Sequence, residues 1–202
     1  MCELNGWNRM RSSLSYDITG NRPQIDYLAA EAGFAYSHIV DKKEQPFNLG
    51  LASALPFTVL AEYGPQDGFE RGVLHVYLDN LRIHVLIVHL NSHDSTARVK
   101  EADIVANFVR GILRSEAGGS QAKIVVMGDF NTLSRWDAAE HSRIDLVTSL
   151  ERTDSAVWGR LSRKFLMENA STINYQPMDT ILAAGMHDAC VVACRNSDYR
   201  AN

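Results

Sequence analysis

One stretch, residues 123–131, constrains this chain more than any other, because in it an apolar strand ends in a glycine, an acid and an amide. The stretch reads Lys-Ile-Val-Val-Met-Gly-Asp-Phe-Asn. Residues 124–127 are typical of a strand buried on both faces, and Gly128 lets the backbone turn without a Cβ penalty. If the extended path continues, Asp129 and Asn131 lie on one side and face a common pocket. The alternative is a turn in which both side chains only satisfy local backbone groups.

An apolar hairpin precedes this strand. Residues 71–78 and 81–89 alternate around Asp79-Asn80, which predicts two antiparallel strands joined by a two-residue turn. The same alternation places His89 at the end of its strand, on the apolar face of the hairpin. The side chains predicted on that face are Leu74, Val76, Leu78, Leu81, Ile83, Val85 and Ile87.

Two histidines lie on the other face of that hairpin. With a two-residue turn, His75 and His84 face each other across the strands, at a spacing that would suit a metal pair. No acidic third ligand lies nearby in sequence. An ordinary cross-strand pair is therefore the favoured interpretation.

The rest of the chain alternates between helical and extended patterns. A helix is predicted from Asn21 to Gly33, with Ile25, Leu28, Ala29 and Ala32 as its apolar face, and strands are predicted over 35–40 and 49–53. A long helix is predicted from Asp94 or Ser95 to about Ser115. Three further helices are predicted over 136–141, 158–169 and 177–184, and a last strand over 189–194. The order strand, helix, loop, strand around the long helix is typical of a crossover connection.

Composition excludes several classes of protein. A chain of 202 residues with 46% hydrophobic and 22% charged residues suits one globular domain. The net charge of −4 does not favour sequence-independent binding along a nucleic-acid backbone. Three cysteines without metal-site spacing argue against a disulfide framework and a zinc site, which favours an intracellular location. With no run of about eighteen apolar residues and no secretory leader pattern, we expect neither a membrane anchor nor a signal peptide.

Gly-Asp-Phe-Asn at residues 128–131 resembles a motif of the endonuclease/exonuclease/phosphatase superfamily, which has the deoxyribonuclease I-like fold. Four further stretches are similar to family motifs and follow the family's order: Cys2 to Gly6, Asn48 to Ser53, Ile87 to Leu90 and Leu182 to Ala189. The resemblance covers nearly the whole chain. The family's first strand and its last strands have no counterpart, so we expect a single domain over residues 1–202, truncated at both ends.

The resemblance implies an α+β fold, a four-layer α/β/β/α sandwich of two packed mixed sheets flanked by helices. It also implies an enzyme, a magnesium-dependent phosphohydrolase with Mn²⁺ as an alternative metal, that cleaves a phosphodiester or phosphomonoester by in-line attack of an activated water. Glu3 would bind the metal, because Mg²⁺ uses one or two protein carboxylates and keeps most of its waters. Asp129 would orient or deprotonate the water, Asn131 would hydrogen-bond a phosphate oxygen, and His89 would contact the phosphate or donate a proton.

Each of these residues also has a structural interpretation. Asp129 and Asn131 are then turn formers, His89 is a satisfied histidine at the rim of the apolar face, and Glu3 is an incidental terminal charge. Arg71 resembles a family arginine that is interpreted as a buried structural cation, with a phosphate contact as the alternative.

Two other family-like features are not assigned a catalytic role. Asp188 is similar to a family position that supports the fold. The triplet Arg143 to Asp145 resembles a catalytic family strand, but it precedes the family's expected position for that strand.

The sequence does not distinguish nucleic-acid, lipid and inositol-phosphate substrates, because specificity in such folds lies in loops. We expect a monomer. We also expect impaired activity, because the family's final aspartate and histidine have no counterpart. The alternative function is a catalytically impaired family member that acts as a binding or scaffold module. Binding of Mg²⁺ by the folded chain would discriminate the two.

Overall fold

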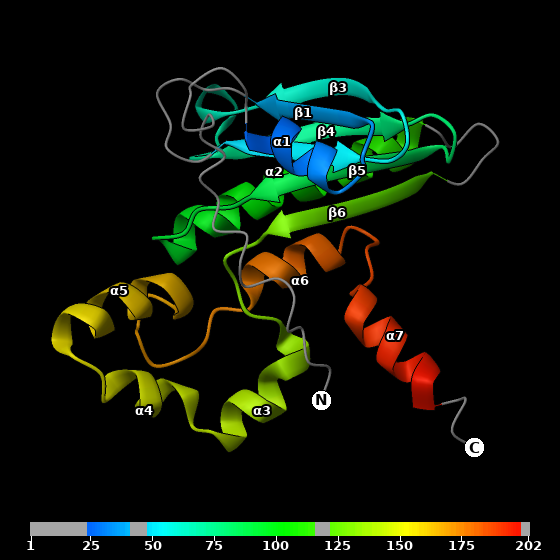
Figure 1. The fold of residues 1–202 in the computed structure, drawn as a ribbon. Helices are drawn as coiled ribbons and strands as arrows, with labels where there is room; N and C mark the ends of the chain where they lie inside the picture. Colours follow the sequence, from blue (N-terminus) through cyan, green and yellow to red (C-terminus); the bar gives the residue numbers. More distant parts are fainter. Residues whose placement is uncertain (1–23, 41–47, 116–121, 199–202) are drawn as a thin grey trace. The chain divides into compact units, whose positions relative to one another are not determined.

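The fold is α+β, and the computed structural model describes residues 24–40, 48–115 and 122–198 (Figure 1). The chain divides into two units, each assembled from segments far apart in sequence. We call them the sheet unit, within residues 3–90 and 115–130, and the helical unit, within residues 91–114 and 131–202. The single domain expected over residues 1–202 stays a prediction.

Four strands form the larger sheet of the sheet unit, in the order β3-β4-β5-β6. They are β3 (Thr58–Tyr63), β4 (Gly72–Leu78), β5 (Ile83–His89) and β6 (Lys123–Asp129), and a 3₁₀ turn, η1 (Pro65–Asp67), lies between β3 and β4. The first three strands pair antiparallel, whereas β6 runs parallel to β5, so the sheet is mixed. The crossover predicted between β5 and β6 is thereby confirmed, and β3 is a strand that the sequence analysis did not predict.

The turn between β4 and β5 differs from the predicted two-residue turn. Leu78 pairs with Ile83, so the four residues 79–82 make the turn, and Arg82 adopts a positive φ of 55°. The pairing is shifted by two residues from the predicted one, and a shift of two keeps every side chain on its face because the side-chain period of a strand is two. The predicted faces are therefore confirmed, except that Leu81 lies in the turn and is exposed.

A second, smaller sheet consists of β1 (Tyr36–Val40) and β2 (Leu49–Ser53), which were both predicted as strands and which pair antiparallel. Helix α1 (Gln24–Glu31) packs on this sheet, and β2 also contacts β4 and β5, which gives the order helix, small sheet, large sheet (Figure 1). Within the described residues the small sheet is wholly antiparallel. The predicted α+β fold with two sheets is confirmed, and among the described strands only the larger sheet is mixed, because β6 runs parallel to β5.

The two ends of α1 were predicted separately. Its predicted start at Asn21 lies outside the described residues. Its predicted end is confirmed, because Gly33 has a φ of 72° and its N–H donates to the carbonyl of Ala30 at 3.1 Å. Ile25 and Ala29 are buried as expected, whereas Leu28 and Ala32 are exposed.

The core of the sheet unit lies between its two sheets. Val40 and Leu49 of the small sheet pack against the apolar face of β4 and β5. The buried residues contributed by that face are Leu74, Val76, Val85 and Ile87. Burial of each such side chain contributes about 1.5–3 kcal/mol relative to exposure. This core fixes which face of β5 is turned inward, and His89 at the end of β5 shares that face.

Strand β6 was predicted to be buried on both faces, and this prediction is wrong. Val125 is 42% exposed, and Lys123 is also exposed. Within the part of the chain that the structure describes, β6 pairs with β5 alone and so forms an edge of the sheet. An apolar run of four residues suits a central strand and an edge strand equally, because pairing is decided by distant segments.

The helical unit contains α2 (Ser95–Ser115), the 3₁₀ turn η2 (Arg135–Asp137), α3 (Ala138–Arg143), α4 (Leu146–Glu151), α5 (Ser155–Phe165), α6 (Gln176–Leu182) and α7 (Ala189–Asp198). Helix α2 begins as predicted, because the Asp94 carboxylate accepts the N–H of Ala97 at 2.8 Å. Helices α3, α5 and α6 overlap the three predicted helices, and α4 was not predicted.

The strand predicted over residues 189–194 is wrong, because these residues belong to α7. The Asp188 carboxylate accepts the N–H groups of Cys190 at 2.9 Å and Val191 at 3.3 Å, which is the arrangement of an N-cap. A cap of this kind outweighs the modest preference of a valine pair for extended structure. Asp188 therefore caps the N-terminus of α7.

The histidine pair on β4 and β5 leads to a prediction about pH. His75 Nε2 lies 3.0 Å from His84 Nδ1, and the pair is diagonal because His84 pairs with Tyr77. Burial, and secondly the neighbouring His84, lower the pKa of His75 from 6.5 to about 4. The unfolded chain therefore binds more protons than the folded chain between these values. We expect this histidine to cost no stability above pH 6.5 and to lower the free energy of unfolding as the pH falls from 6.5 to about 4.

Urea unfolding at a series of pH values measures this effect. His75→Gln should flatten the decrease between pH 6.5 and pH 4 relative to the wild type, because glutamine does not titrate. The control is His187→Gln, since His187 is exposed. Parallel pH profiles for the wild type and His75→Gln would contradict the prediction.

Candidate functional site

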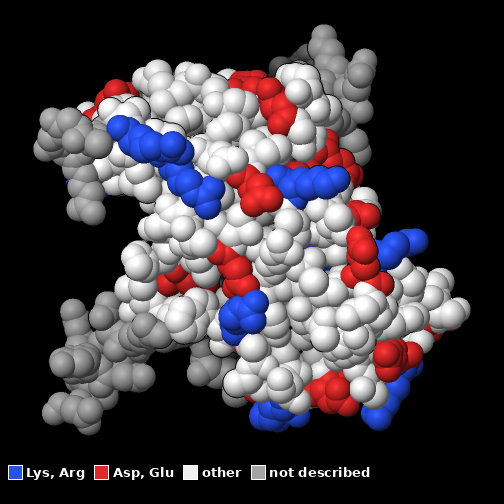
Figure 2. Space-filling model, turned by 180° about the vertical axis from the view of Figure 1, so that it is seen from behind, with Lys and Arg blue, Asp and Glu red and all other residues white. Residues whose placement is uncertain are grey.

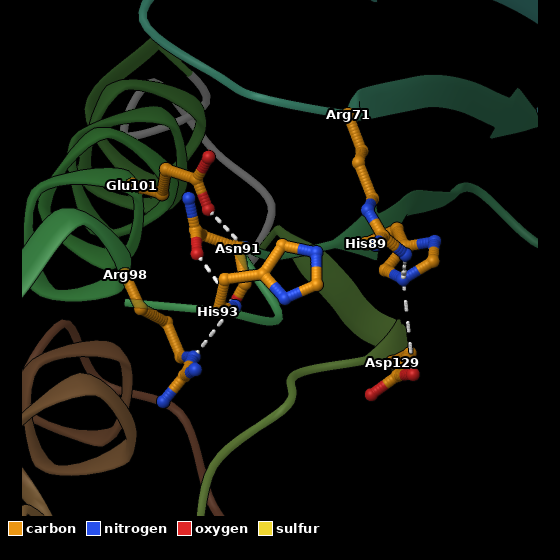
Figure 3. A network of polar contacts seen from close by, with 7 residues as sticks. All are labelled: Arg71, His89, Asn91, His93, Arg98, Glu101 and Asp129. Atoms are coloured by element: carbon orange, nitrogen blue, oxygen red, sulfur yellow. Dashed lines mark hydrogen bonds and ion pairs between the residues drawn. The ribbon is translucent and has the colours of Figure 1, made fainter. Parts of the chain in front are cut away.

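His89 and Asp129 end two adjacent parallel strands at the same edge of the sheet. They are paired in register across β5 and β6, and both lie on the face that the apolar core occupies further along the strands. His89 Nε2 is 3.8 Å from Asp129 Oδ2 (Figure 3). The predicted convergence of these two residues is confirmed, although forty residues separate them in sequence. This distance is too long for a hydrogen bond.

Arg71 is the third member of this cluster. It directly precedes Gly72, which is paired with His89 across β4 and β5, and its Nη1 lies 2.5 Å from His89 Nε2 (Figure 3). A guanidinium can only donate hydrogen bonds, so His89 Nε2 is the acceptor and the neutral imidazole carries its proton on Nδ1. Arg71 is half-buried, so it partly matches the predicted buried cation.

Exposure differs sharply between the members of the cluster. The His89 side chain is 5% exposed, whereas the Asp129 side chain is 60% exposed. The imidazole is thus held within the protein, and the carboxylate is open to water. A cation, a neutral imidazole and an exposed carboxylate can bind an anionic group and accept a proton from a water molecule.

Two glycines allow the backbones around this cluster to approach closely. Gly128 has a φ of 130°, and a Cβ atom there would lie 2.1 Å from the carbonyl oxygen of Val88. Gly72 has a φ of 143°, and a Cβ atom there would lie 2.4 Å from the carbonyl oxygen of Tyr63. Only glycine fits both conformations without displacing backbone. These two positions therefore permit the pairing that brings His89 beside Asp129 and Arg71.

The other predicted site residues are Asn131 and Glu3. Strand β6 ends at Asp129, and Asn131 adopts a φ of 50°. The extended path that would have placed both side chains on one side does not continue, so that part of the prediction is wrong. Asn131 belongs to the helical unit, and its convergence with His89 stays a prediction. Glu3 lies outside the described residues.

A buried polar network holds the loop that begins α2 in the helical unit. Glu101 Oε2 accepts the N–H of Asn91 at 2.5 Å, and Arg98 Nε donates to the carbonyl of Asn91 at 2.6 Å (Figure 3). The Asn91 side chain in turn accepts the N–H groups of His93 and Asp94. Arg98 and Glu101 are 1% and 2% exposed, so both backbone polar groups of Asn91 are fixed by buried charges.

These buried charges were not predicted, although the sequence contains a signal for them. Arg98 and Glu101 are three residues apart and continue the stripe of buried positions on α2 that includes Ala102, Val105 and Val109. Helical spacing places all five on one face. Two charged residues at core positions of a helix indicate buried partners.

The cluster of Arg71, His89 and Asp129 offers few ligands for a metal ion. Within residues 24–40, 48–115 and 122–198, no group of three or more His, Cys, Asp or Glu side chains could hold one. Asp129 provides one of the one or two carboxylates that Mg²⁺ uses, but a second would have to come from elsewhere in the chain. The described residues by themselves do not fit a metal site.

Two further observations concern the surface charge and the hydropathy of the helices. The face of the molecule in Figure 2 carries lysines and arginines interspersed with acidic residues, without a continuous basic stripe. None of the helices in the described ranges combines the length and the apolar character needed to cross a membrane.

No protein-family model, curated protein or solved structure matches this chain. The resemblance to the endonuclease/exonuclease/phosphatase superfamily therefore rests on the motifs in the sequence.

Proposed function

We propose that this chain is a phosphohydrolase that depends on Mg²⁺, or alternatively Mn²⁺, and cleaves a phosphodiester or phosphomonoester. The observation that carries the proposal is the cluster of Arg71, His89 and Asp129 at the carboxyl ends of β5 and β6. The family resemblance implies catalytic roles for His89 and Asp129, and a phosphate contact is the alternative role of Arg71. Their spatial proximity is what a hydrolytic site at that edge of the sheet requires.

Each residue of the cluster has a role that fits its contacts. The Arg71 guanidinium has five N–H donors in a planar fork, which is the geometry that suits phosphate oxygens. His89 accepts a hydrogen bond from Arg71. It is therefore a positioning residue that orients the guanidinium. Asp129, with its exposed carboxylate, accepts a proton from the attacking water or orients it. Asn131, by the family resemblance, would donate to a phosphate oxygen.

A second candidate function, a non-catalytic binding module, is favoured by one specific contact. The hydrogen bond from Arg71 engages His89 Nε2, so that nitrogen carries no proton that it could give to a leaving group. The module would keep the cluster as a purely structural connection between β4 and β5. Enzyme assays separate the two candidates.

Asp129→Asn should lower the rate of hydrolysis by about 10²–10⁴-fold, because the variant cannot accept a proton from water. The measurement is a panel of single-stranded DNA, RNA, lipid phosphates and inositol phosphates, each assayed with Mg²⁺ and with excess chelator. Asp103→Asn is the matched control, since Asp103 is an exposed residue of α2. If no substrate is cleaved in a manner sensitive to both the chelator and Asp129→Asn, the phosphohydrolase proposal fails. Heat released by Mg²⁺ binding to the folded wild type, measured by titration calorimetry, tests the metal independently of substrate.

A further inference from the structure

An open groove lies in the helical unit, away from the residues of the proposed phosphohydrolase site in sequence. Its volume is about 770 Å³, and it is lined by residues of η2, α3, α4 and α6 and of the segment before α6. Leu146, Val147 and Ile173 provide aliphatic surface, and Tyr175 and His141 provide aromatic surface. A concave site with apolar walls and a few polar groups is the usual form of a small-molecule site.

The aromatic surface of the groove is a stacked pair of rings, and the Arg135 guanidinium carbon lies 5.3 Å from the centroid of the Tyr175 ring. The rings of His141 and Tyr175 are inclined by 11° with their centroids 5.7 Å apart, and His141 Nδ1 lies 2.8 Å from the Tyr175 hydroxyl. Burial raises the pKa of Tyr175, so its hydroxyl stays protonated at neutral pH. The two rings therefore hold each other in place.

The groove has an excess of negative charge. Its charged lining residues are Arg135, Asp145 and Asp179, one cation and two anions, which gives a net charge of −1 with His141 counted as neutral. Arg135 is already committed, because its Nε and Nη2 donate to Asp179 Oδ2 at 2.9 Å and 2.5 Å. Asp145 is exposed and makes no side-chain hydrogen bond or ion pair to the described residues. One carboxylate is thus available to a ligand.

We propose that this groove binds a small organic cation, an ammonium or guanidinium group carried on an apolar and preferably aromatic body. The Asp145 carboxylate receives the cation, and Tyr175 and the aliphatic wall contact the body. Met167, which also lines the groove and is 42% exposed, adds apolar surface for the body. An anionic ligand is disfavoured, because the only cation among the lining residues is paired. This proposal does not depend on the phosphohydrolase activity.

The first test compares three probes of one shape and different charge. Phenethylamine, 2-phenylethanol and phenylacetate are titrated into the isotopically labelled full chain at low salt, and backbone amide shifts are followed by NMR. Phenethylamine should shift amides of α3, α4 and α6 saturably, and 2-phenylethanol should bind about tenfold more weakly because it lacks the charge. Equal affinity for the amine and the alcohol, or shifts located elsewhere, would overturn the proposal.

The second test removes the charge of Asp145 without changing its backbone. Asp145 has a φ of 46°, a conformation that asparagine also tolerates, so Asp145→Asn should fold normally. This variant should bind phenethylamine about tenfold more weakly than the wild type and should bind 2-phenylethanol with unchanged affinity. Asp103→Asn is the control for loss of one exposed charge and should change neither. Unchanged amine affinity in Asp145→Asn would refute the assigned cation site.

A second variant tests the stacked pair of His141 and Tyr175. Tyr175→Leu should lower the affinity for phenethylamine and for 2-phenylethanol alike. It removes surface that contacts the ring shared by both probes, and it leaves the Asp145 charge in place. Comparison of phenethylamine with N-acetyl-lysine amide then identifies the source of the cation as a free amine or a peptide side chain. Failure of both cations to bind would overturn the proposal and leave the enzyme assays unaffected.

Discussion

Replacement of Gly128 by alanine is expected to destabilise the sheet unit by about 3–5 kcal/mol. The new Cβ atom would lie 2.1 Å from the carbonyl oxygen of Val88, which is backbone and cannot rotate away. Alanine also disfavours the φ of 130° at this position. Relief of the clash requires β6 to move from β5, so the distance between His89 and Asp129 should increase. Urea unfolding monitored by circular dichroism measures the change in stability.

The control for Gly128→Ala is Gly111→Ala. Gly111 lies inside α2, and a Cβ atom there would meet nothing within 4 Å. Alanine at a helix-interior position of this kind should stabilise the protein by about 0.5–1 kcal/mol. The two substitutions are chemically identical and should have opposite signs. A Gly128→Ala variant as stable as the wild type would show that the close pairing of β5 and β6 is absent.

Replacement of Arg98 by methionine is expected to destabilise the protein by about 3–5 kcal/mol. Methionine has a similar volume, but it removes the donors to the carbonyls of Asn91 and Lys164, both at 2.6 Å. It also leaves the Glu101 carboxylate buried without the neighbouring cation on its helix face. A shift of about 2–4 °C in melting temperature is expected for each kcal/mol in a chain of this size.

A double-mutant cycle separates packing from charge in this network. Glu101→Gln alone should also destabilise the protein, and Arg98→Met combined with Glu101→Gln should cost less than the sum of the two, because no buried charge is left uncompensated. Arg114→Met, at the exposed end of α2, is the matched control and should change stability by less than about 0.5 kcal/mol. Additive effects of Arg98→Met and Glu101→Gln would show that the two charges act independently.

The composition of the site depended on the length of one turn. With the predicted two-residue turn, His89 would pair with residue 70, a glutamate, whereas the four-residue turn pairs it with Gly72 and brings Arg71 to its imidazole. A slip of two residues preserves the faces of both strands and changes the neighbour of His89 from an anion to a cation. The alternation of the sequence could not distinguish these registers, because both satisfy it.

The other differences between prediction and structure have different origins. The run at residues 124–127 indicates a strand correctly, but its place at the edge of the sheet follows from pairing with distant segments. The helix α7 was predictable in principle, since Asp188 at its start is a local signal that the valine pair obscured. The burial of Arg98 and Glu101 required knowledge of which face of α2 is covered.

By itself, the sequence determined the faces of β4 and β5, the start of α2 at Asp94, the end of α1 at Gly33 and the placement of His89 and Asp129 at strand ends. These features depend on side-chain periodicity, capping and glycine conformation, which act over a few residues. The tertiary structure alone decided that Arg71 contacts His89, that β6 is an edge strand within the described residues, and that an acidic groove forms around Tyr175. Those features depend on registers and contacts between segments tens of residues apart, where several arrangements satisfy the same local pattern and the packing of the whole unit selects among them.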